Sequence, residues 1–452
     1  MRRPMAPPPW SDIADHVAQS GALARLMSVF PDLRQSQQYR HWDELRHRQP
    51  PDKIRSAEEW WFLTKLSRSS GMRELPLDDA SSGKFRYSLP DEVLRELDFS
   101  ATHLRGRIAV NEQVTNPATR EQYLVGSLME EAITSSQLEG ASTSKRVAKE
   151  MIQSGRQPRD RSERMILNNY YAMERVGQLR DKPLTVEVIC DLHRIVTEGT
   201  LDNPDCAGRF QLPNEERVGV FDDQGELLHE PPPAGEIDAR MAQLCAFANE
   251  DSSKYYLPGV LRALAIHFMV GYIHPFEDGN GRTARILFYW SMLNQGYWLT
   301  EFISVSSLLN AAKVQYGRSF LYTETDDGDL TYFFIYHLGI LHRCIDHLNS
   351  YLTRKAEEMS EVRNLLAREE ENFNGRQIAI IRNALRNPAF SYSVQSHMRA
   401  HRIGMETARK DLIELEEANL LARQRSGKKF IYRPMADLAG RLRDAGSRAH
   451  GR

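Results

Sequence analysis

The sequence predicts a mainly α-helical protein with one small β-hairpin in its central part and a winged helix-turn-helix at its C-terminal end. Three observations favour this fold class. Apolar residues recur at helical spacing along most of the chain. Two short apolar runs flank the turn-forming residues 222–225. Three helical segments followed by two strand-like runs close the sequence. Because 452 residues are many for one core, we expect several packed units.

The N-terminal region, residues 1–104, is expected to consist of helices joined by polar loops. Its first helical segment begins with Ser11, a candidate N-cap that precedes apolar residues at helical spacing. The pair Pro50 and Pro51 interrupts the next helical segment, and the stretch 78–84 is rich in turn-forming residues.

The central region, residues 105–353, is expected to form the largest helical unit. Helical periodicity covers several stretches of it: 120–151, 161–179, 185–200 and 237–351. Between them lies the predicted hairpin, within residues 215–230, whose two apolar runs surround Asp-Asp-Gln-Gly and end at prolines.

A charged helical linker, residues 354–372, leads to the C-terminal segment 373–452. Gly404 precedes the third helix of that segment, and Ala408, Leu412 and Leu415 fall on one face of it. Two strand-like runs around Ser426 and Gly427 follow, as in a winged helix-turn-helix.

The C-terminal segment differs in charge from the rest of the chain. Residues 376–433 hold 12 Lys and Arg against 5 Asp and Glu, whereas the whole chain has a net charge of −2. The basic candidates for a DNA contact are Arg399, Arg402, Arg409, Lys410, Arg423, Arg425, Lys428 and Lys429. Three acids late in the third helix oppose this interpretation, and winged helices also dock proteins, so both roles stay open.

Composition restricts the class of protein. Hydrophobic residues make up 41% and charged residues 27%, which is ordinary for a soluble globular chain. The four cysteines show no CxxC spacing, which fits a reducing compartment and disfavours a disulfide scaffold or zinc knuckle. The first ten residues lack the apolar stretch of a secretory signal, and no uncharged apolar run is long enough to cross a membrane. We therefore expect a cytoplasmic protein without a membrane partner.

The string HPFEDGNGRTAR, from His274 to Arg285, carries the strongest chemical signal. An apolar helix is expected before His274, and a second helix is expected from Arg282. The loop therefore lies at a helix N-terminus, where free N–H groups and the helix dipole attract anions. Gly279 and Gly281 allow the backbone N–H groups to converge on phosphate oxygens.

The side chains of this string complete a phosphate site. Arg282 and Arg285 are three residues apart and can face the same anion, for which guanidinium groups are well suited. Asp278 offers a hard oxygen ligand for a magnesium ion shared with phosphates. His274 can accept a proton near neutral pH. The pattern thus predicts phosphate binding together with Mg²⁺ and a general base.

The string resembles the signature of the Fic family, HxFx(D/E)GNGRxxR. It agrees at His274, Phe276, Asp278, Gly279, Asn280, Gly281, Arg282 and Arg285. The resemblance implies a Fic-type helical core and an enzyme that transfers AMP from ATP to a Ser, Thr or Tyr hydroxyl of a protein.

The resemblance also implies residue roles. His274 would deprotonate the acceptor hydroxyl, and Asp278 would hold Mg²⁺ between the α- and β-phosphates. Asn280 and the loop N–H groups would hold phosphate, and Arg285 would meet the γ-phosphate. Phe276 is interpreted as an apolar anchor for the loop.

A second motif, SSQLEG at Ser135–Gly140, resembles the family's inhibitory motif (S/T)xxxE(G/N). Its residues predict the C-terminal end of a helix over about residues 122–140, with Gly140 terminating that helix. A Glu in the last turn is disfavoured by the helix dipole and gains from a cationic partner. The resemblance implies that Glu139 pairs with Arg285 and blocks productive seating of the γ-phosphate, with Ser135 bonding near the same site.

The predicted hairpin resembles the family's target-docking flap, which would pair its strand edge with an extended target segment. The flap candidates are Val218, Gly219, Val220, Leu227 and Leu228. Tyr316 is a weaker candidate for a contact on the adenine side of the nucleotide.

Three interpretations of function stay open. The first is a self-inhibited protein adenylyltransferase whose partners are ATP and a protein target, which can be the chain itself. The second is a DNA-binding regulator whose core only senses nucleotide, although such a sensor needs no base at His274. The third keeps the site but removes AMP or transfers another phosphate-containing group. Several bacterial relatives form dimers, but no motif here fixes a homodimer interface.

Overall fold

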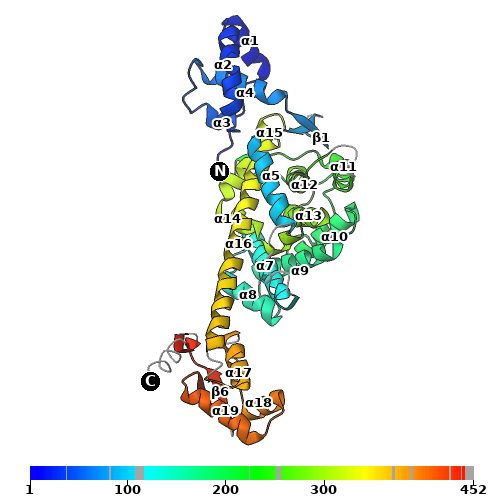
Figure 1. Ribbon diagram of the computed structural model, residues 1–452. Coiled ribbons are helices and arrows are strands. Elements are labelled where there is room, and N and C mark those ends of the chain that lie inside the picture. The colour runs from blue at the N-terminus through cyan, green and yellow to red at the C-terminus, as the bar shows by residue number, and fades with distance from the viewer. Residues whose placement is uncertain are drawn as a thin grey trace. The chain divides into compact units, whose positions relative to one another are not determined.

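The computed structural model describes residues 1–36, 38–80, 83–106, 117–222, 224–250, 256–368, 372–386, 390–426, 429–438 and 440–442. Gly427 of the expected turn, the DNA-contact candidate Lys428 and the residues from 443 on lie outside this set. The chain divides into two compact units, Met1–Leu348 and Asn349–Arg452. It is mainly helical, as the sequence predicts (Figure 1).

The N-terminal part of the first unit contains four short helices and a hairpin. The helices are α1 (Trp10–Gln19), α2 (Leu23–Ser36), α3 (Trp42–Leu45) and α4 (Ala57–Ser69). Ser56 caps α4, because its Oγ accepts the Glu59 N–H at 3.2 Å. Buried Leu26, Trp42 and Trp61 belong to their shared core.

The hairpin of β1 (Arg73–Asp78) and β2 (Lys84–Tyr87) was not predicted. Only its turn, within residues 78–84, is indicated by the sequence. The period of two is nevertheless present, since Leu75, Leu77, Phe85 and Tyr87 are all at most 1% exposed. Strands of six and four residues carry too little periodicity to be distinguished from a loop.

The rest of the first unit is built around two central helices, α12 (Gly259–Ile273) and α13 (Asn280–Asn294). α12 is buried along nearly its whole length, and α13 packs on it and on the neighbouring helices α9 and α10 (Figure 1). The surrounding helices are α5 (Asp91–Leu104), α7 (Pro117–Leu138), α8 (Lys145–Ser154), α9 (Arg161–Leu179), α10 (Val186–Thr197), α11 (Ile237–Asn249), α14 (Val305–Ala311), α15 (Lys313–Thr325) and α16 (Thr331–Arg368).

A short antiparallel hairpin, β3 (Val220–Phe221) with β4 (Leu227–His229), lies where the sequence predicts one. Three 3₁₀ segments, Pro204–Cys206, Ala234–Glu236 and Trp298–Phe302, complete the described part of this unit.

The second unit holds the end of α16, three helices and a hairpin. These are α17 (Gly375–Arg386), α18 (Val394–His401), α19 (Met405–Glu417), and β5 (Leu421–Ser426) paired antiparallel with β6 (Lys429–Pro434). Buried Asp411 accepts bonds from the Arg376 guanidinium and lies 2.9 Å from His397 Nε2. Burial would raise the pKa of Asp411, but these bonds lower it to about 2. The order of elements agrees with the sequence, and the winged-helix interpretation stays a prediction.

Across the described part of the chain, every helix is too short or too polar to cross a bilayer.

Several histidines are buried, and burial penalises their charged form. Desolvation lowers the pKa of His41, His193 and His274 to about 4 and that of His337 to about 3. The imidazoles are therefore neutral near pH 7, and none of them contributes a buried charge to the core.

These histidines predict acid destabilisation. An unfolded histidine titrates near pH 6.5, so below that pH the unfolded state binds protons that the folded state excludes until about pH 4. The free energy of unfolding should therefore fall as pH drops from 6.5 toward 4, by up to about 1.4 kcal/mol per pH unit for each such histidine. Denaturant titrations at about pH 7.5, 6.5 and 5.5 measure how the free energy of unfolding changes with pH. His337→Leu should reduce this change and His347→Leu, at an exposed position, should not; equal stability at all three pH values contradicts the account.

Candidate active site

The segment 274–285 forms the joint between α12 and α13. His274 follows the last residue of α12 in the left-handed conformation, with a φ of 49°, and its N–H donates to Val270 O at 3.0 Å. Gly279, with a φ of 84°, precedes α13. A non-glycine residue in this backbone region is strained, and such strain is concentrated at functional sites. The base candidate therefore lies at one helix end and the anion cradle at the next.

Among the described residues, the Nδ1 of His274 has a hydrogen-bond partner and its Nε2 has none. Its Nδ1 lies 3.2 Å from Gly271 O, and because a carbonyl only accepts, Nδ1 carries the proton and Nε2 keeps its lone pair. Burial lowers the pKa of His274 to about 4, so this lone pair is available at neutral pH.

Arg217, which the sequence analysis missed, holds the end of α12 in place. Its guanidinium donates to His274 O at 2.8 Å and also to Ile273 O. Burial lowers the pKa of Arg217 to about 10, which still leaves the group charged at neutral pH. A cation on the last carbonyls of a helix is the arrangement that the helix dipole favours.

The loop between the two helices is fixed by its own side chains. Phe276 is fully buried and stacks on His193 of α10, with ring centroids 3.6 Å apart and planes inclined by 2°. Asn280 Oδ1 accepts the Phe276 N–H at 2.9 Å, and Asn280 Nδ2 donates to Phe276 O at 2.8 Å. The side chain of Asn280 thus closes the loop, and a phosphate contact from this residue would have to come from its backbone N–H.

His193 is a second residue that the sequence analysis missed. Its Nδ1 accepts the Gly208 N–H at 2.9 Å, so Nε2 carries the proton and donates to Asp278 O at 2.8 Å. Burial lowers its pKa to about 4, which keeps this tautomer neutral. The imidazole therefore orients the backbone of the residue predicted to hold the metal.

Asp278 is the predicted metal ligand and is half-exposed. Its Oδ1 accepts the Gly279 N–H at 2.6 Å, while Oδ2 lies 3.5 Å from Arg282 Nη2 and 3.7 Å from Arg161 Nη2. Among the described residues there is no group of three or more His, Cys, Asp or Glu side chains that could hold a metal. A single carboxylate fits Mg²⁺ that takes its remaining ligands from phosphates and water, which is common at nucleotide sites.

Arg282 is 0% exposed and points toward the end of α10. Its Nη1 donates to Val196 O at 2.8 Å. Two guanidinium nitrogens of the motif, Arg282 Nε and Arg285 Nη1, are buried and have no hydrogen-bond partner among the described residues. Unpaired buried donors are unfavourable, and an anion bound at this helix end is the kind of ligand that would pair them.

Glu139 and Arg285, 146 positions apart in the sequence, meet in the structure. Arg285 Nη2 donates to Glu139 Oε1 at 2.8 Å and to Ser135 O at 3.0 Å, and Arg285 Nε donates to Ser135 Oγ at 2.8 Å. Burial would lower the pKa of Arg285, but the Glu139 carboxylate outweighs it and the pKa is raised. α7 ends just before Glu139, and Gly140, with a φ of 95°, turns the chain away.

The Glu139 carboxylate lies directly over Gly281, because a Cβ added at Gly281 would overlap its Oε1. Gly281 is in the first turn of α13, where the helix N–H groups have no partner within the helix. The carboxylate therefore stands at the place where the sequence predicts bound phosphate.

Tyr316 of α15 lies beside Arg285, which perturbs its hydroxyl electrostatically. The Tyr316 hydroxyl is 2.8 Å from His267 Nε2, and burial raises the pKa of Tyr316 to about 12. Its place is thus next to the guanidinium, and the expected adenine contact stays a prediction.

The predicted flap residues lie next to the end of α12, although the strands are shorter than predicted. Val220 and Leu227 are in β3 and β4, while Val218 and Gly219 precede β3. Leu228 is buried, whereas Phe221 and Leu227 are 58% and 40% exposed. His229 Nε2 contacts Tyr272 O at 2.8 Å, which joins β4 to the turn of α12 that precedes His274.

Comparisons with known proteins agree with this geometry. Residues 183–292 match the model of the Fic/DOC family. The proteins named protein adenylyltransferase Fic from Drosophila melanogaster and Drosophila sechellia are each 35% identical over 114 residues, or 25% of this chain. The chain spans about a fifth of the length of these curated relatives, 21% in each case.

A solved structure shares the fold over a larger part of the chain. A Fic family protein from Desulfovibrio desulfuricans G20 superposes with a TM-score of 0.53 at 20% identity, over 78% of this chain and 98% of that one. The family match covers the segment that carries the His274–Arg285 joint, and the shared fold extends well beyond it. Residues 183–292, which include this joint, are thus similar to the Fic/DOC family.

Proposed function

We propose that this protein is a protein adenylyltransferase that moves AMP from ATP to a Ser, Thr or Tyr hydroxyl of a protein and is restrained by Glu139. The observation that carries the proposal is the position of one carboxylate. Glu139 is paired with Arg285 and lies over Gly281, in the first turn of α13. This helix begins six positions after His274. Proteins that are 35% identical to this chain over 114 residues bear the name protein adenylyltransferase.

The residues suit the proposed reaction. His274 Nε2 accepts the proton of the acceptor hydroxyl, whose oxygen bonds to the α-phosphorus of ATP while the bond from that phosphorus to the bridging oxygen breaks. The leaving pyrophosphate takes the electron pair. Asp278 would hold Mg²⁺, which when bound stabilises negative charge on the phosphates. The N–H groups at the start of α13 and the unpaired Arg282 Nε and Arg285 Nη1 would hold the phosphate oxygens.

The proposed restraint follows from competition between two anions. The γ-phosphate and the Glu139 carboxylate would both need Arg285 and the space over Gly281. Glu139 is one third exposed, with a side-chain exposure of 32%, so it can leave without exposing a core. In its paired state ATP would bind with its phosphates displaced from the line of attack, which lowers the rate of transfer rather than preventing binding.

Target docking is proposed for the hairpin β3–β4. Exposed Phe221 and Leu227 flank its turn, and the strand edge can pair with an extended segment of another chain. Because His229 joins this hairpin to α12, a hydroxyl held along the edge would lie near His274.

The experiment that tests the function uses ATP labelled at the α-phosphate, Mg²⁺ and a cell lysate, with the unmodified chain and its Glu139→Gly variant. Transfer of AMP predicts labelled proteins whose mass spectra show AMP on a hydroxyl side chain. ATP labelled only at the γ-phosphate is the control, and it should leave all proteins unlabelled. Label from the γ-phosphate would identify phosphate transfer instead and contradict the proposal.

DNA binding by the second unit is proposed as an additional property. Arg399 and Arg402 at the end of α18 and Arg409 in the first half of α19 are exposed, and none of them forms an ion pair within the described ranges. Two other basic side chains already form ion pairs: Arg423 lies 3.4 Å from Glu416, and Lys410 lies 3.8 Å from Glu414. The exposed arginines are thus the ones expected to meet phosphates.

A gel shift with random-sequence duplex at low salt measures this property. Replacing Arg402 and Arg409 by Gln should weaken binding about tenfold and reduce its salt dependence, because two phosphate contacts are lost. The matched control is Arg95→Gln in the first unit, at an exposed position of α5. Absence of any shift at low salt removes the DNA role.

A further inference from the structure

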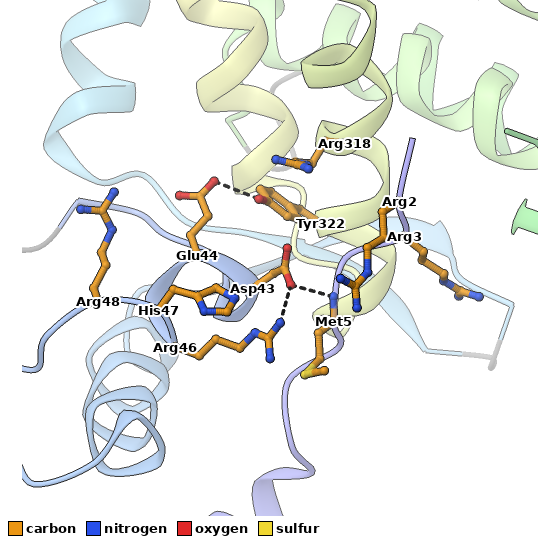
Figure 2. Close-up of a pocket in the computed structure, with 10 residues that line it drawn as sticks. All are labelled: Arg2, Arg3, Met5, Asp43, Glu44, Arg46, His47, Arg48, Arg318 and Tyr322. Atoms are coloured by element: carbon orange, nitrogen blue, oxygen red, sulfur yellow. Dashed lines mark hydrogen bonds and ion pairs between the residues drawn. The ribbon is translucent and has the colours of Figure 1, made fainter. Parts of the chain in front are cut away.

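A cavity of about 670 Å³ lies in the first unit, away from the joint of α12 and α13. Figure 2 shows it between the N-terminal arm, α3 with the residues that follow it, and α15. Its lining is dominated by basic side chains: Arg2, Arg3, Arg46, His47, Arg48 and Arg318. Only two carboxylates, Asp43 and Glu44, oppose these five guanidinium groups.

The two carboxylates are already engaged by other groups. Glu44 Oε1 accepts the Tyr322 hydroxyl at 2.9 Å, and Asp43 Oδ1 accepts the Met5 N–H at 3.0 Å (Figure 2). Asp43 Oδ1 is also 3.6 Å from Arg46 Nη2, which is a long contact for an ion pair. The acids therefore leave most of the positive charge at the cavity uncompensated.

Four of the five guanidinium groups, in contrast, form no ion pair among the described residues, and the fifth, that of Arg46, has only the long contact to Asp43. These four belong to Arg2, Arg3, Arg48 and Arg318. Arg46 Nε and Arg318 Nε are buried and have no hydrogen-bond partner in the part of the chain that the structure describes. These two buried donors, one directly after α3 and one in α15, indicate a ligand with several acceptor oxygens.

The walls of the cavity are held together firmly. The ring of His41 stacks on the ring of Tyr322 with centroids 4.3 Å apart, and His41 Nε2 contacts Thr325 Oγ1 at 3.2 Å. These contacts, with the bond from Tyr322 to Glu44, fix the start of α3 on α15. The arginines that project from both walls are therefore presented by a preformed frame, which lowers the entropic cost of binding.

We infer that this cavity binds the phosphates of a small soluble ligand, a di- or triphosphate group that is free or part of a nucleotide. A planar guanidinium group can donate two parallel hydrogen bonds to the oxygens of one phosphate. A ligand with several negative charges also matches the excess of arginines better than a single carboxylate would. The volume of 670 Å³ suits a small ligand. No base-stacking surface is offered by Tyr322, since His41 covers one face of its ring and its buried side chain is 8% exposed. Recognition therefore rests on phosphate and is independent of the proposed AMP transfer.

Calorimetric titration of the whole chain with inorganic diphosphate, without Mg²⁺ and at low salt, tests the inference. An Arg285→Gln background weakens the phosphate site at α13, so the heat reports on the basic cavity. In that background the pair Arg46→Gln and Arg318→Gln should weaken binding at least about tenfold. Arg48→Gln alone should weaken it less, and it serves as a second probe because the Arg48 guanidinium forms no hydrogen bond or ion pair in the described ranges. The matched control Arg95→Gln should leave the affinity unchanged.

ADP, which carries the same number of phosphates as the inorganic probe, distinguishes the two ligand sources. Similar affinity for ADP and diphosphate supports recognition of phosphate alone, and tighter binding of ADP that is still lost in the Arg46/Arg318 variant supports a nucleotide. Thermal unfolding of each variant establishes that it is folded. The inference is overturned if folded variants bind diphosphate as tightly as their parent, or if the parent binds none at low salt.

Discussion

Glu139→Gly is expected to raise transfer of AMP to protein by at least about tenfold over the unmodified chain. The substitution removes the carboxylate that now pairs with Arg285 at 2.8 Å and lies over Gly281, so the γ-phosphate can take both. Glu139 follows the last residue of α7 and is partly exposed, hence a glycine there costs little helix stability. Self-labelling from α-labelled ATP, followed over time, gives the ratio of initial rates.

Two further variants separate charge from size at this position. Glu139→Gln keeps the side-chain length but loses the ion pair with Arg285, so it should activate less than glycine. Glu121→Gln, at an exposed position of α7, the helix that precedes Glu139, is the matched control and should leave the rate unchanged. If Glu139→Gly binds ATP normally and labels nothing, the self-inhibition account is wrong. If it instead loses an ability to remove AMP from modified protein, Glu139 orients a water and the site works in the opposite direction.

His274→Ala, introduced into Glu139→Gly, should lower transfer by about 100-fold or more while ATP still binds. Desolvation lowers the pKa of the partly buried His274 imidazole to about 4, and its Nε2 is the acceptor left at the end of α12. Nothing in the anion cradle depends on this side chain, because the cradle is built from the start of α13 and its arginines. Rates from α-labelled ATP, with nucleotide affinity from calorimetry, measure the two effects separately.

The pH profile adds a second readout to the same experiment. A base whose pKa is about 4 is unprotonated at neutral pH, so the rate of Glu139→Gly should stay level from pH 7.5 toward weakly acidic pH and fall as pH approaches that pKa. His347→Ala, which changes an exposed histidine of α16, is the control and should keep full activity. Undiminished labelling by the His274→Ala variant would exclude His274 as the base.

The parts of the site that are contiguous in sequence could be predicted, and those that depend on distant segments could not. The joint from His274 to Arg285 carries its chemistry in twelve neighbouring positions, so residue types alone indicated phosphate, metal and base. Nothing near His193 or Arg217 distinguishes them from other polar residues. Their roles come from burial against Asp278 and the end of α12, which only the folded chain reveals.

The direction in which a side chain points was the second feature that the sequence could not predict. Asn280 was expected at phosphate, yet its amide spans the loop to Phe276, because the six-residue connection between the two helices leaves backbone groups that need partners. The hairpin β1–β2 was missed for a related reason. Its alternation becomes meaningful only when Leu75 and Phe85 are seen to be buried on one face.

The absence of a side chain at position 281 ties restraint to catalysis. An alanine there would collide with the Glu139 carboxylate and, equally, would crowd any phosphate oxygen brought to the same helix turn. A substitution at position 281 could therefore not remove the inhibition by Glu139 without also weakening phosphate binding. Release of the enzyme has to come from movement of α7 or from changes in its last residues, and natural variants with altered regulation should concentrate there.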